Sequence, residues 1–310
     1  MMFSLVSRMS VLACALGIVL ISSDVSGQKS TSEAKRKIAA LVKIAALVSA
    51  VDGAEAAVAF SDPQTGAELL INADTDFHAA STMKVPVMME IFRQARKSKL
   101  SLDEKITVRN EFQSIVDKSA YKLTPEDDSE QSLYGRVGET VPLGELMRLM
   151  ITESSNLATN ILIERVTPAR VMELMRDLGA KDIRVRRGVE DEKAYEKGLN
   201  NTTTARDLMI VLSPIAGRRA VSAEASDEMI RILSAQKFKE GIPAGLPATA
   251  RVAHKTGSIT KIRHDAGIVF LPHRKKPYVL VVLTRGITDA KRADQLIADI
   301  SRTIYDNLEK

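Results

Sequence analysis

The spacing of apolar residues changes twice along the chain. Near both ends, short apolar runs bounded by turn-forming residues are typical of β-strands. The pattern predicts strands at residues 56–60, 68–71, 252–255, 265–271 and 278–284. From about residue 100 to 235, apolar residues recur every three or four positions, which is typical of amphipathic helices. The chain is therefore expected to have strands at its two ends and helices in its middle.

Further helices flank the predicted strands. They are expected at residues 29–51, 84–97 and 289–308. Pro86 falls in the first turn of the second of these helices, where its missing backbone N–H leaves no helical hydrogen bond unmade. Two stretches, 121–139 and 183–201, are polar and without clear periodicity, so we expect surface loops there.

This order of elements predicts an α+β fold. One antiparallel sheet, built from both chain ends, is flanked by helices in a three-layer α/β/α arrangement, and an all-helical lobe is inserted between its strands. We assign residues 28–80 and 236–310 to the α/β lobe and about 81–235 to the helical lobe, within one catalytic domain at 28–310. A cleft between two such lobes is a usual place for an active site.

Composition restricts the classes of function. With 310 residues, 45% of them hydrophobic, the chain can bury a large core, and a disordered or fibrous protein is excluded. The net charge of +5 is mild, aromatic residues make up 4%, and no dense Lys/Arg stripe is interleaved with them. These features argue against a nucleic-acid partner.

The N-terminus has the three parts of a secretory signal. Arg8 provides a positive charge, an apolar run follows at 11–21, and small residues at 25–27 precede a cleavage point. The run is short for a membrane span. We therefore expect residues 1–27 to be a signal peptide whose removal leaves an exported, periplasmic or secreted protein without stable membrane association. A retained anchor is the alternative.

Cys14 is the only cysteine in the sequence. If the signal is removed, the remaining chain has neither a disulfide nor a thiol nucleophile. Residues 11–14 also resemble a lipobox, so lipidation of Cys14 stays open as a second alternative, although the apolar run continues past this cysteine.

Ser81 and Lys84 stand three residues apart at the start of a predicted helix. One helical turn places them on the same face. Serine is a weak nucleophile unless a base lies beside it, and a desolvated lysine amine is such a base. The helix N-terminus also supplies N–H groups and a positive dipole where an oxyanion forms. Alone, this spacing is common and equally fits a capping serine and a solvated lysine.

Two further motifs follow Ser81 and Lys84. Residues 154–156 (Ser-Ser-Asn) begin a predicted helix about 70 residues later, and residues 254–258 (His-Lys-Thr-Gly-Ser) lie on a predicted strand about 100 residues beyond. The set resembles the Ser-x-x-Lys, Ser-Asp-Asn and Lys-Thr-Gly motifs of class A β-lactamases and penicillin-binding proteins. The resemblance covers nearly the whole of residues 28–310, and the class A β-lactamases are the members we favour.

The resemblance implies four catalytic roles, in addition to the loop carboxylate considered below. Ser81 attacks the lactam carbonyl, and Lys84 takes its proton directly or through a relay. Ser154 passes a proton to the leaving nitrogen. Lys255 holds Ser154 and attracts the substrate carboxylate.

The resemblance also implies the substrate-binding residues. Thr256 and Ser258 bind the substrate carboxylate through their hydroxyls, and Asn156 bonds the substrate side-chain amide and the catalytic lysine. The backbone N–H groups of Ser81 and Ser258 form the oxyanion hole. Gly257 lets the substrate backbone approach the strand closely.

The sequence departs from the family pattern in two places. Ser155 stands where the family usually has Asp. In the loop at 183–201, Arg187 and Glu190 are separated by one residue more than in the family's Arg-x-Glu, whose Glu activates the water that releases the acyl-enzyme. Glu190 is our candidate for this base. The rivals in the same loop are Asp191, Glu192 and Glu196, and all four carboxylates also fit a solvated loop face.

No metal or cofactor is predicted. The four histidines are His78, His254, His264 and His273. No two of them have the sequence spacing of a metal-ligand pair. We expect His254 to pack beside the site as a strand residue. Arg263 and Arg285 are both candidates for a cation that supports the substrate carboxylate.

The sequence thus favours a monomeric exported hydrolase that opens small-molecule β-lactams through an acyl-serine intermediate, giving antibiotic resistance. A D,D-peptidase or related serine amidase acting on cell-wall peptides is one alternative, and it would not need Glu190. A penicillin-binding sensor that is acylated without turnover is another. A family member with weak esterase activity is a third.

Overall fold

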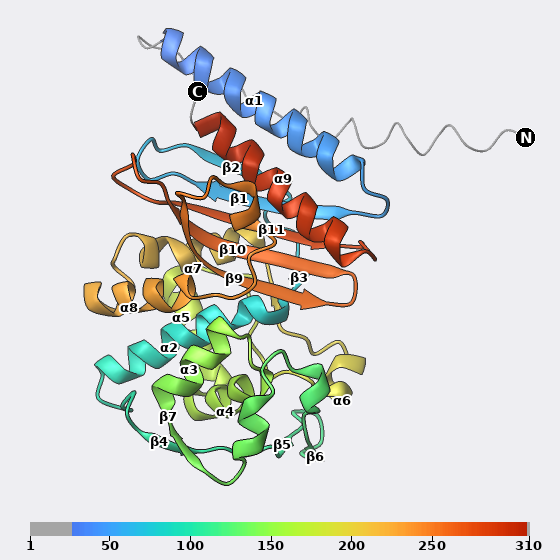
Figure 1. Cartoon of the computed structure of the whole chain (residues 1–310), viewed down its shortest axis with the longest axis vertical. Coiled ribbons are helices and arrows are strands. Elements are labelled where there is room, and N and C mark those ends of the chain that lie inside the picture. Colours follow the sequence, from blue (N-terminus) through green and yellow to red (C-terminus); the bar gives the residue numbers. More distant parts are fainter. Residues whose placement is uncertain (1–26, 309–310) are drawn as a thin grey trace, which may run out of the picture. The chain divides into compact units, whose positions relative to one another are not determined.

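The central feature of the protein is a five-stranded antiparallel sheet (Figure 1). The computed structural model describes residues 27–308, so residues 1–26 of the predicted signal peptide, with Cys14, lie outside the described residues. The strands, in the order β2-β1-β11-β10-β9, are β1 (Glu55–Ser61), β2 (Glu68–Ile71), β9 (Arg251–Ile259), β10 (Ile262–Phe270) and β11 (Tyr278–Arg285). Because β1 pairs along its length with β11, the predicted sheet built from both chain ends is confirmed.

Strands β9 and β10 are longer than the apolar pattern predicted. β9 continues beyond Lys255 to Ile259, and β10 already begins at Ile262. The paired segments beyond Lys255 carry polar residues such as Ser258 and Arg263, which face each other in the register. Polar residues on a strand interrupt the apolar periodicity, so this part of the hairpin could not be recognised from hydrophobicity alone.

Both faces of the sheet are covered. Alternate residues of β11 enter two different hydrophobic cores: Val279, Val281 and Leu283 on one face, and Tyr278, Leu280 and Val282 on the other. This follows from the two-residue period of a strand, and it explains the continuous apolar run of β11. The second core includes residues of the closing helix α9 (Ala290–Leu308).

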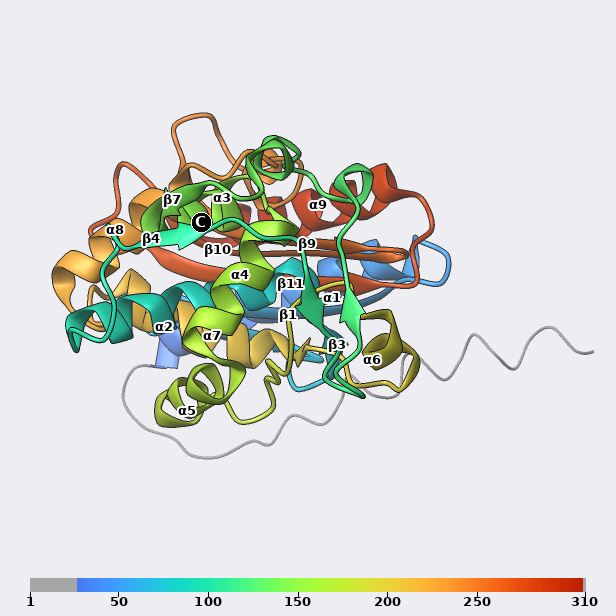
Figure 2. The same cartoon turned by 90° about the horizontal axis from the view of Figure 1, so that it is seen from below.

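The other face of the sheet packs against the helices of the middle of the chain, which lie nearer the viewer than the sheet in Figure 2. These are α2 (Lys84–Arg96), α3 (Leu143–Thr152), α4 (Asn156–Val166), α5 (Pro168–Leu178), α7 (Ala205–Ala216) and α8 (Ala223–Ser234), with the short α6 (Glu192–Glu196). The α+β class with helices inserted between the strands of the sheet is thereby confirmed.

Short two-stranded ribbons accompany these helices. The sequence pattern did not predict these ribbons. They pair β3 (Phe77–His78) with β8 (Thr202–Thr203), β4 (Lys105–Thr107) with β7 (Thr140–Pro142), and β5 (Phe112–Gln113) with β6 (Ala120–Tyr121). The first ribbon matters for the site, because it joins the chain just before Ser81 to the end of the loop at 183–201.

Helix α1 (Gly27–Ser49) spans two compact units of the chain, which divide between Ala39 and Ala40. In the second unit, Ala40 and Ile44 are buried in the same core as α9. Among residues 27–308, no helix combines the length and the apolar character needed to cross a membrane.

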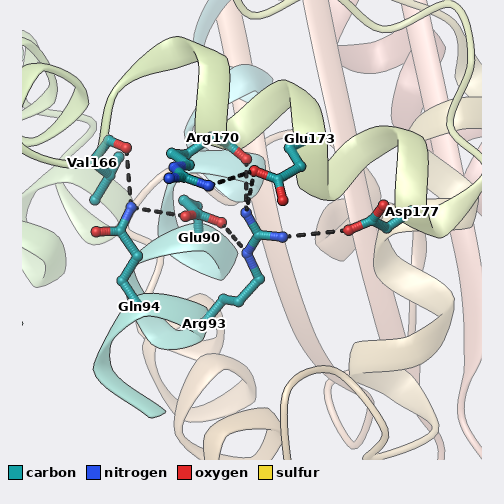
Figure 3. A network of polar contacts seen from close by, with 7 residues as sticks. All are labelled: Glu90, Arg93, Gln94, Val166, Arg170, Glu173 and Asp177. Atoms are coloured by element: carbon teal, nitrogen blue, oxygen red, sulfur yellow. Dashed lines mark hydrogen bonds and ion pairs between the residues drawn. The ribbon is translucent and has the colours of Figure 1, made fainter. Parts of the chain in front are cut away.

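A buried ion-pair network fixes α2 against α5 (Figure 3). The carboxylate of Glu90, of which 1% is exposed, accepts hydrogen bonds from Arg93 Nε at 2.6 Å and from Gln94 Nε2 at 2.8 Å. Arg93 continues to the carbonyl oxygen of Arg170 at 3.1 Å and to Asp177 at 3.4 Å. Since α2 begins with Lys84, the network holds the helix that carries this lysine.

We expect Arg93→Ala to lower the free energy of unfolding by about 3 kcal/mol, because it leaves the buried Glu90 carboxylate without its cation. For a chain of this size the melting temperature falls by about 5 °C. Arg206→Ala is the control, because its partner Asp74 is 63% exposed and such pairs contribute little. Equal melting temperatures of the two variants would contradict a structural role for the network.

Candidate active site

Ser81 lies in a short 3-10 helix, Ala80–Met83, that leads directly into α2. Three bonds hold the segment before it: the Ala79 N–H donates to the Asn201 carbonyl at 2.8 Å, the Ala80 N–H to His78 Nδ1 at 3.1 Å, and the Thr82 hydroxyl to the Ala79 carbonyl at 2.6 Å. Ser81 is half-buried and lines a cavity of about 280 Å³. The candidate nucleophile is therefore held on a fixed turn that opens into a cavity.

Lys84 is fully buried and makes several hydrogen bonds. Its Nζ donates to the Ser154 carbonyl at 2.6 Å, to Asn156 Oδ1 at 3.0 Å and to Ser154 Oγ at 3.2 Å. Burial is the main cause that lowers its pKa to about 7, although the nearby carboxylates of Asp128 and Glu190 oppose the shift. The amine is therefore able to accept a proton near neutral pH.

Among residues 27–308, the Ser81 hydroxyl has no hydrogen-bond partner. The Lys84 amine contacts Ser154 and Asn156 rather than Ser81. Ser81 and Ser154 line the same cavity. Hydrogen bonds between catalytic residues often tighten only when substrate is bound. The structure thus brings Lys84, Ser154 and Asn156 into one hydrogen-bonded cluster and places Ser81 at the cavity that this cluster adjoins.

Ser154 Oγ accepts hydrogen bonds from two amines, since Lys255 Nζ donates to it at 3.0 Å and Lys84 Nζ at 3.2 Å. Lys255 is fully buried, and burial together with the charge of Lys84 lowers its pKa well below the ordinary value. Ser154 has φ 61°, a conformation rare for residues other than glycine. A hydroxyl held between two amines of lowered pKa can pass a proton from one to the other.

The start of α4 shows what replaces the aspartate that the family usually has at position 155. Ser155 caps the helix, accepting the Ala158 N–H at 3.2 Å. A carboxylate from elsewhere, Asp128 Oδ2, accepts the N–H groups of Asn156 at 2.8 Å and Leu157 at 2.9 Å. Sequence reasoning missed Asp128, because it lies in a polar stretch whose pattern does not fix any partner.

Glu190 is connected to the lysine cluster through Asn156. Asn156 Nδ2 donates to Glu190 Oε1 at 2.6 Å, while its Oδ1 accepts from Lys84. Burial raises the pKa of Glu190, with smaller raising contributions from Asp128 and Asp127, and the Asn156 bond lowers it. Asn156 lines the cavity and Glu190 contacts Asn156. A carboxylate of raised pKa in this position is suited to general-base chemistry.

The three rival carboxylates of the loop lie elsewhere. Asp191 caps α6 through the Ala194 N–H and accepts the Ser114 hydroxyl at 2.8 Å and the Ile115 N–H at 2.9 Å. Glu192 and Glu196 are exposed on α6. Of the four candidates, the structure therefore places Glu190 against Asn156.

The loop that carries Glu190 is clamped from both sides. Asn160 Oδ1 accepts the Val189 N–H at 2.6 Å, and Asn201 Oδ1 accepts the Arg186 N–H at 2.7 Å. A Cβ on Gly188 would come within 2.3 Å of Asn160 Oδ1, so the close approach of this loop to Asn160 requires glycine. Glu190 itself has φ 60°. Asn160 and Gly188 thus position the loop, although no pattern in the sequence singled them out for this.

Strand β9 passes directly against the turn that holds Ser81. A Cβ on Gly257 would lie 3.2 Å from the side chains of Ala80 and Thr82. The approach of β9 to this turn is one reason for glycine here, and Gly257 also lines the cavity, where the resemblance places a substrate backbone. Thr256 and Ser258 line the cavity on the same strand.

The two candidate arginines have different positions. Arg263 lines the cavity, with its Nε 4.0 Å from Asp294. Arg285 instead pairs with Glu55 and lies over the ring of Phe77, 4.7 Å from its centroid. Arg263 is thus the arginine of the two that the structure offers to a substrate carboxylate.

The histidines near the cavity have structural partners. His254 Nδ1 lies 2.8 Å from Asp265 Oδ1, and both side chains are buried. His264 Nε2 lies 2.9 Å from the His78 carbonyl, and burial lowers the pKa of His264 to about 4. In the described part of the chain, no cluster of three His, Cys, Asp or Glu side chains is arranged to hold a metal ion.

We expect the rate of acylation to fall as pH drops below about 7. In the role that the resemblance implies, the neutral form of Lys84 accepts the Ser81 proton, and a pKa of about 7 makes this form scarcer by about tenfold for each further pH unit. Stopped-flow acylation by a penicillin between pH 5 and 9 measures the dependence. A flat profile across this range would remove Lys84 as the base.

A serine at a cavity, two buried amines, a bridging hydroxyl and a carboxylate define a serine hydrolase that works through an acyl-enzyme. Comparison with known proteins agrees, since a model of the β-lactamase enzyme family matches residues 35–308. The chain belongs to the β-lactamase enzyme family, and the resemblance to the class A enzymes that the motifs indicated is confirmed.

Several relatives cover most of the chain. A β-lactamase of Streptomyces albus G is 27% identical over 291 residues, which is 91% of this chain and 87% of the relative. The extended-spectrum β-lactamase PER-1 of Pseudomonas aeruginosa is 25% identical over 263 residues, 80% of each chain.

Solved structures are similar over the same region. PBP-A has a TM-score of 0.73 and 26% identity, covering 90% of this chain and 96% of that one. A mutant of PBP-A was solved as an acyl-enzyme complex with penicillin G, with TM-score 0.73 and 27% identity over 90% of this chain and 97% of that one. A β-lactamase from Sphaerobacter thermophilus has TM-score 0.72 and 26% identity, covering 86% and 96%.

Proposed function

We propose that the protein hydrolyses the amide bond of β-lactams through an acyl-serine intermediate and so gives resistance to β-lactam antibiotics. The observation that carries the proposal is the continuous hydrogen-bonded chain from Lys255 through Ser154 and Lys84 to Asn156 and Glu190. It ends beside the cavity that Ser81 lines, and it contains both a base for acylation and a carboxylate for deacylation.

In the first half-reaction, Ser81 Oγ gives its proton to neutral Lys84 and attacks the lactam carbonyl carbon. The oxyanion that forms is stabilised by backbone N–H groups, which the family resemblance assigns to Ser81 and Ser258. As the carbon–nitrogen bond breaks, the ring nitrogen takes the hydroxyl proton of Ser154. Ser154 is re-protonated from the amines beside it, so that the proton taken from Ser81 finally resides on the leaving nitrogen.

In the second half-reaction, water attacks the ester carbonyl and Glu190 takes a proton from it. The bond to Ser81 Oγ breaks, and this oxygen recovers a proton from Glu190, so that the hydroxyl and the carboxylate are both regenerated. The substrate carboxylate is bound by Thr256 and Ser258 with the positive charge of Arg263 nearby, which orients the carbonyl toward Ser81.

The likeness to PBP-A supports a second candidate, a D,D-peptidase acting on cell-wall peptides. Such an enzyme would use Ser81, Lys84, Ser154 and Lys255 but would not need Glu190 in contact with Asn156. The position of Glu190 is the reason that we favour hydrolysis of β-lactams over a peptidase or a sensor that retains the acyl group.

Turnover of a chromogenic cephalosporin by purified residues 28–310 tests the proposal. We expect many turnovers per molecule, with no requirement for added metal or cofactor. Release of one equivalent of product followed by a stable covalent adduct would instead identify a sensor. Activity on D-Ala-D-Ala peptides with no cephalosporin turnover would identify the peptidase.

We also propose that the protein is exported to the periplasm or medium after removal of residues 1–27, and that it acts there as a monomer without stable membrane association. The charged, apolar and small-residue segments of the N-terminus support export. The N-terminal sequence of protein recovered outside the cytoplasm tests processing, and its elution on size exclusion tests the monomer. A protein that retains residues 1–27 in the membrane fraction would contradict this proposal.

A further inference from the structure

A second cavity, of about 830 Å³, lies away from the active site. It is formed where the turn after α7, helix α8, the first residue of β9, the last residue of β10 and the β10–β11 turn meet. We call it the cationic cleft, because Arg218, Arg219, Arg231, Arg251, Lys275 and Lys276 line it. It shares no lining residue with the active-site cavity.

The charges of the cationic cleft are not balanced within it. Asp227 is the carboxylate that lines it, and it pairs with Arg218. Arg231 pairs with Glu228. Three further cations lie on the turn after α7 and on the β10–β11 turn, namely Arg219, Lys275 and Lys276. Within residues 27–308, their side chains make no hydrogen bond or ion pair. Unpaired cations gathered around a concave surface raise the local concentration of anions.

Part of the lining of the cationic cleft is apolar, and we call this part its apolar floor. Ala216, Ile230, Phe270 and Pro277 contribute to its lining. The guanidinium of Arg251 lies over the ring of Phe270, 3.8 Å from its centroid, and donates to Ser234 Oγ at 3.0 Å. Arg251 is therefore fixed in place as a charged edge to an apolar surface.

The turn that carries the two lysines is also fixed. Arg274 pairs with the buried carboxylate of Asp62. Gln64 Oε1 accepts the N–H groups of Lys275 at 3.0 Å and Lys276 at 3.1 Å. A ligand would thus meet backbone that is already ordered, and binding would cost little conformational entropy apart from that of the lysine side chains.

We propose that the cationic cleft binds an amphiphilic anion, namely a phosphate headgroup joined to an apolar chain. The free cations on the two turns bind the headgroup, since arginine and lysine are both favoured partners of phosphate. The apolar chain lies on Ile230 and Phe270, out of water. An anion without an apolar part would leave this floor exposed, and an apolar molecule without charge would leave the cations unused.

The cleft is separate from the reaction. Arg251 begins β9, and Lys255 follows four residues later on the same strand, roughly 13 Å away at 3.3 Å per residue. Binding is therefore expected in the acylated enzyme and in a Ser81→Ala variant as well as in the free enzyme. A failure of ligand binding at the cleft would therefore leave the proposed hydrolysis of β-lactams unaffected, and a failure of hydrolysis would leave the cleft unaffected.

Isothermal titration with octyl phosphate, kept below its micelle concentration, tests the inference on the processed chain. We expect saturable binding of one equivalent that is at least about tenfold tighter than inorganic phosphate, and no binding of octyltrimethylammonium. Equal affinity for inorganic phosphate would overturn the role of the apolar floor. Equal binding of the cationic amphiphile would overturn the role of the charges.

Two triple variants test whether the cations of the cleft bind the ligand. Arg219→Gln with Lys275→Gln and Lys276→Gln should weaken octyl phosphate binding by about tenfold or more, the effect of three exposed charge contacts, while hydrolytic activity is retained. The control removes three exposed lysines outside the cleft, Lys105, Lys122 and Lys181, again as Gln. Equal losses in the two triple variants would show that net charge alone is responsible and would overturn the site.

Vesicles of phosphatidylglycerol form the last arm, because the same headgroup chemistry occurs in a bilayer. Vesicle binding that the first triple variant loses identifies a membrane lipid as the source of the ligand. Binding of monomeric octyl phosphate without vesicle binding identifies a free amphiphile. Vesicle binding without any binding of the monomer would overturn the cleft as the site.

Discussion

Ser81→Ala is expected to abolish covalent acylation by β-lactams and to lower kcat/KM by about 10⁵-fold or more, as the loss of a catalytic nucleophile does in other serine hydrolases. The reason is chemical, because no other hydroxyl replaces the one on the turn that begins α2. Ser154 lines the same cavity, but its Oγ is held between Lys84 and Lys255. Intact mass after incubation with a penicillin measures acylation directly.

A matched control for Ser81→Ala is Ser129→Ala. Ser129 also lines the cavity, and its hydroxyl donates to the Glu153 carbonyl at 2.8 Å. Acylation should be retained in this variant within a few-fold. Covalent labelling of the Ser81→Ala protein at another residue, with its melting temperature unchanged, would contradict the assignment of the nucleophile.

The site was predictable from the order and spacing of three short motifs along the chain. Residues 81–84, 154–156 and 254–258 are each short, and each lies at the beginning of a helix or on a strand of the sheet. The resemblance of these motifs to those of the class A β-lactamases implied that Lys84, Ser154 and Lys255 meet in one site, and in the structure both lysine amines donate to Ser154 Oγ.

The residues that position these groups were not predictable in the same way. Asp128 reaches the start of α4 from a loop, and Asn160 holds the chain at Val189 from the middle of α4. Both interactions depend on the path of an irregular segment. Loop paths are set by many tertiary contacts and leave no period in the sequence.

Glu190, the carboxylate that we propose for deacylation, was only partly predictable. The spacing from Arg187 placed it within a loop of four acids but did not select one of them. Tertiary contacts distinguish the acids of the loop. Asp191 caps α6, whereas Glu190 accepts a hydrogen bond from Asn156. Glu190, which follows the extra residue after Arg187, has a left-handed backbone conformation, φ 60°.

Glu190→Gln is expected to slow release of the acyl-enzyme by about 10²- to 10⁴-fold, which is the contribution of a general base, while acylation continues. The amide side chain can still accept the Asn156 Nδ2 hydrogen bond, so the cluster around Lys84 is preserved. A penicillin should then produce a stoichiometric covalent adduct on Ser81 that persists in mass spectra after the wild-type enzyme has turned over its substrate.

The same residue gives deacylation a pH dependence. Burial raises the pKa of Glu190, and the base must be ionised to accept a proton from water. Deacylation therefore slows as pH falls through this raised pKa and reaches its plateau above it. In Glu190→Gln the residual deacylation should lose this dependence, which a change confined to structure would not produce.

Glu192→Gln and Glu196→Gln are the matched controls, since both remove a carboxylate from the same loop at an exposed position. Their deacylation rates should equal that of the unmodified enzyme within a few-fold. Rapid release in Glu190→Gln, or a trapped acyl-enzyme in Glu192→Gln or Glu196→Gln, would show that proximity to Asn156 does not identify the base. The contact between Asn156 and Glu190 would then have to be explained as loop packing alone.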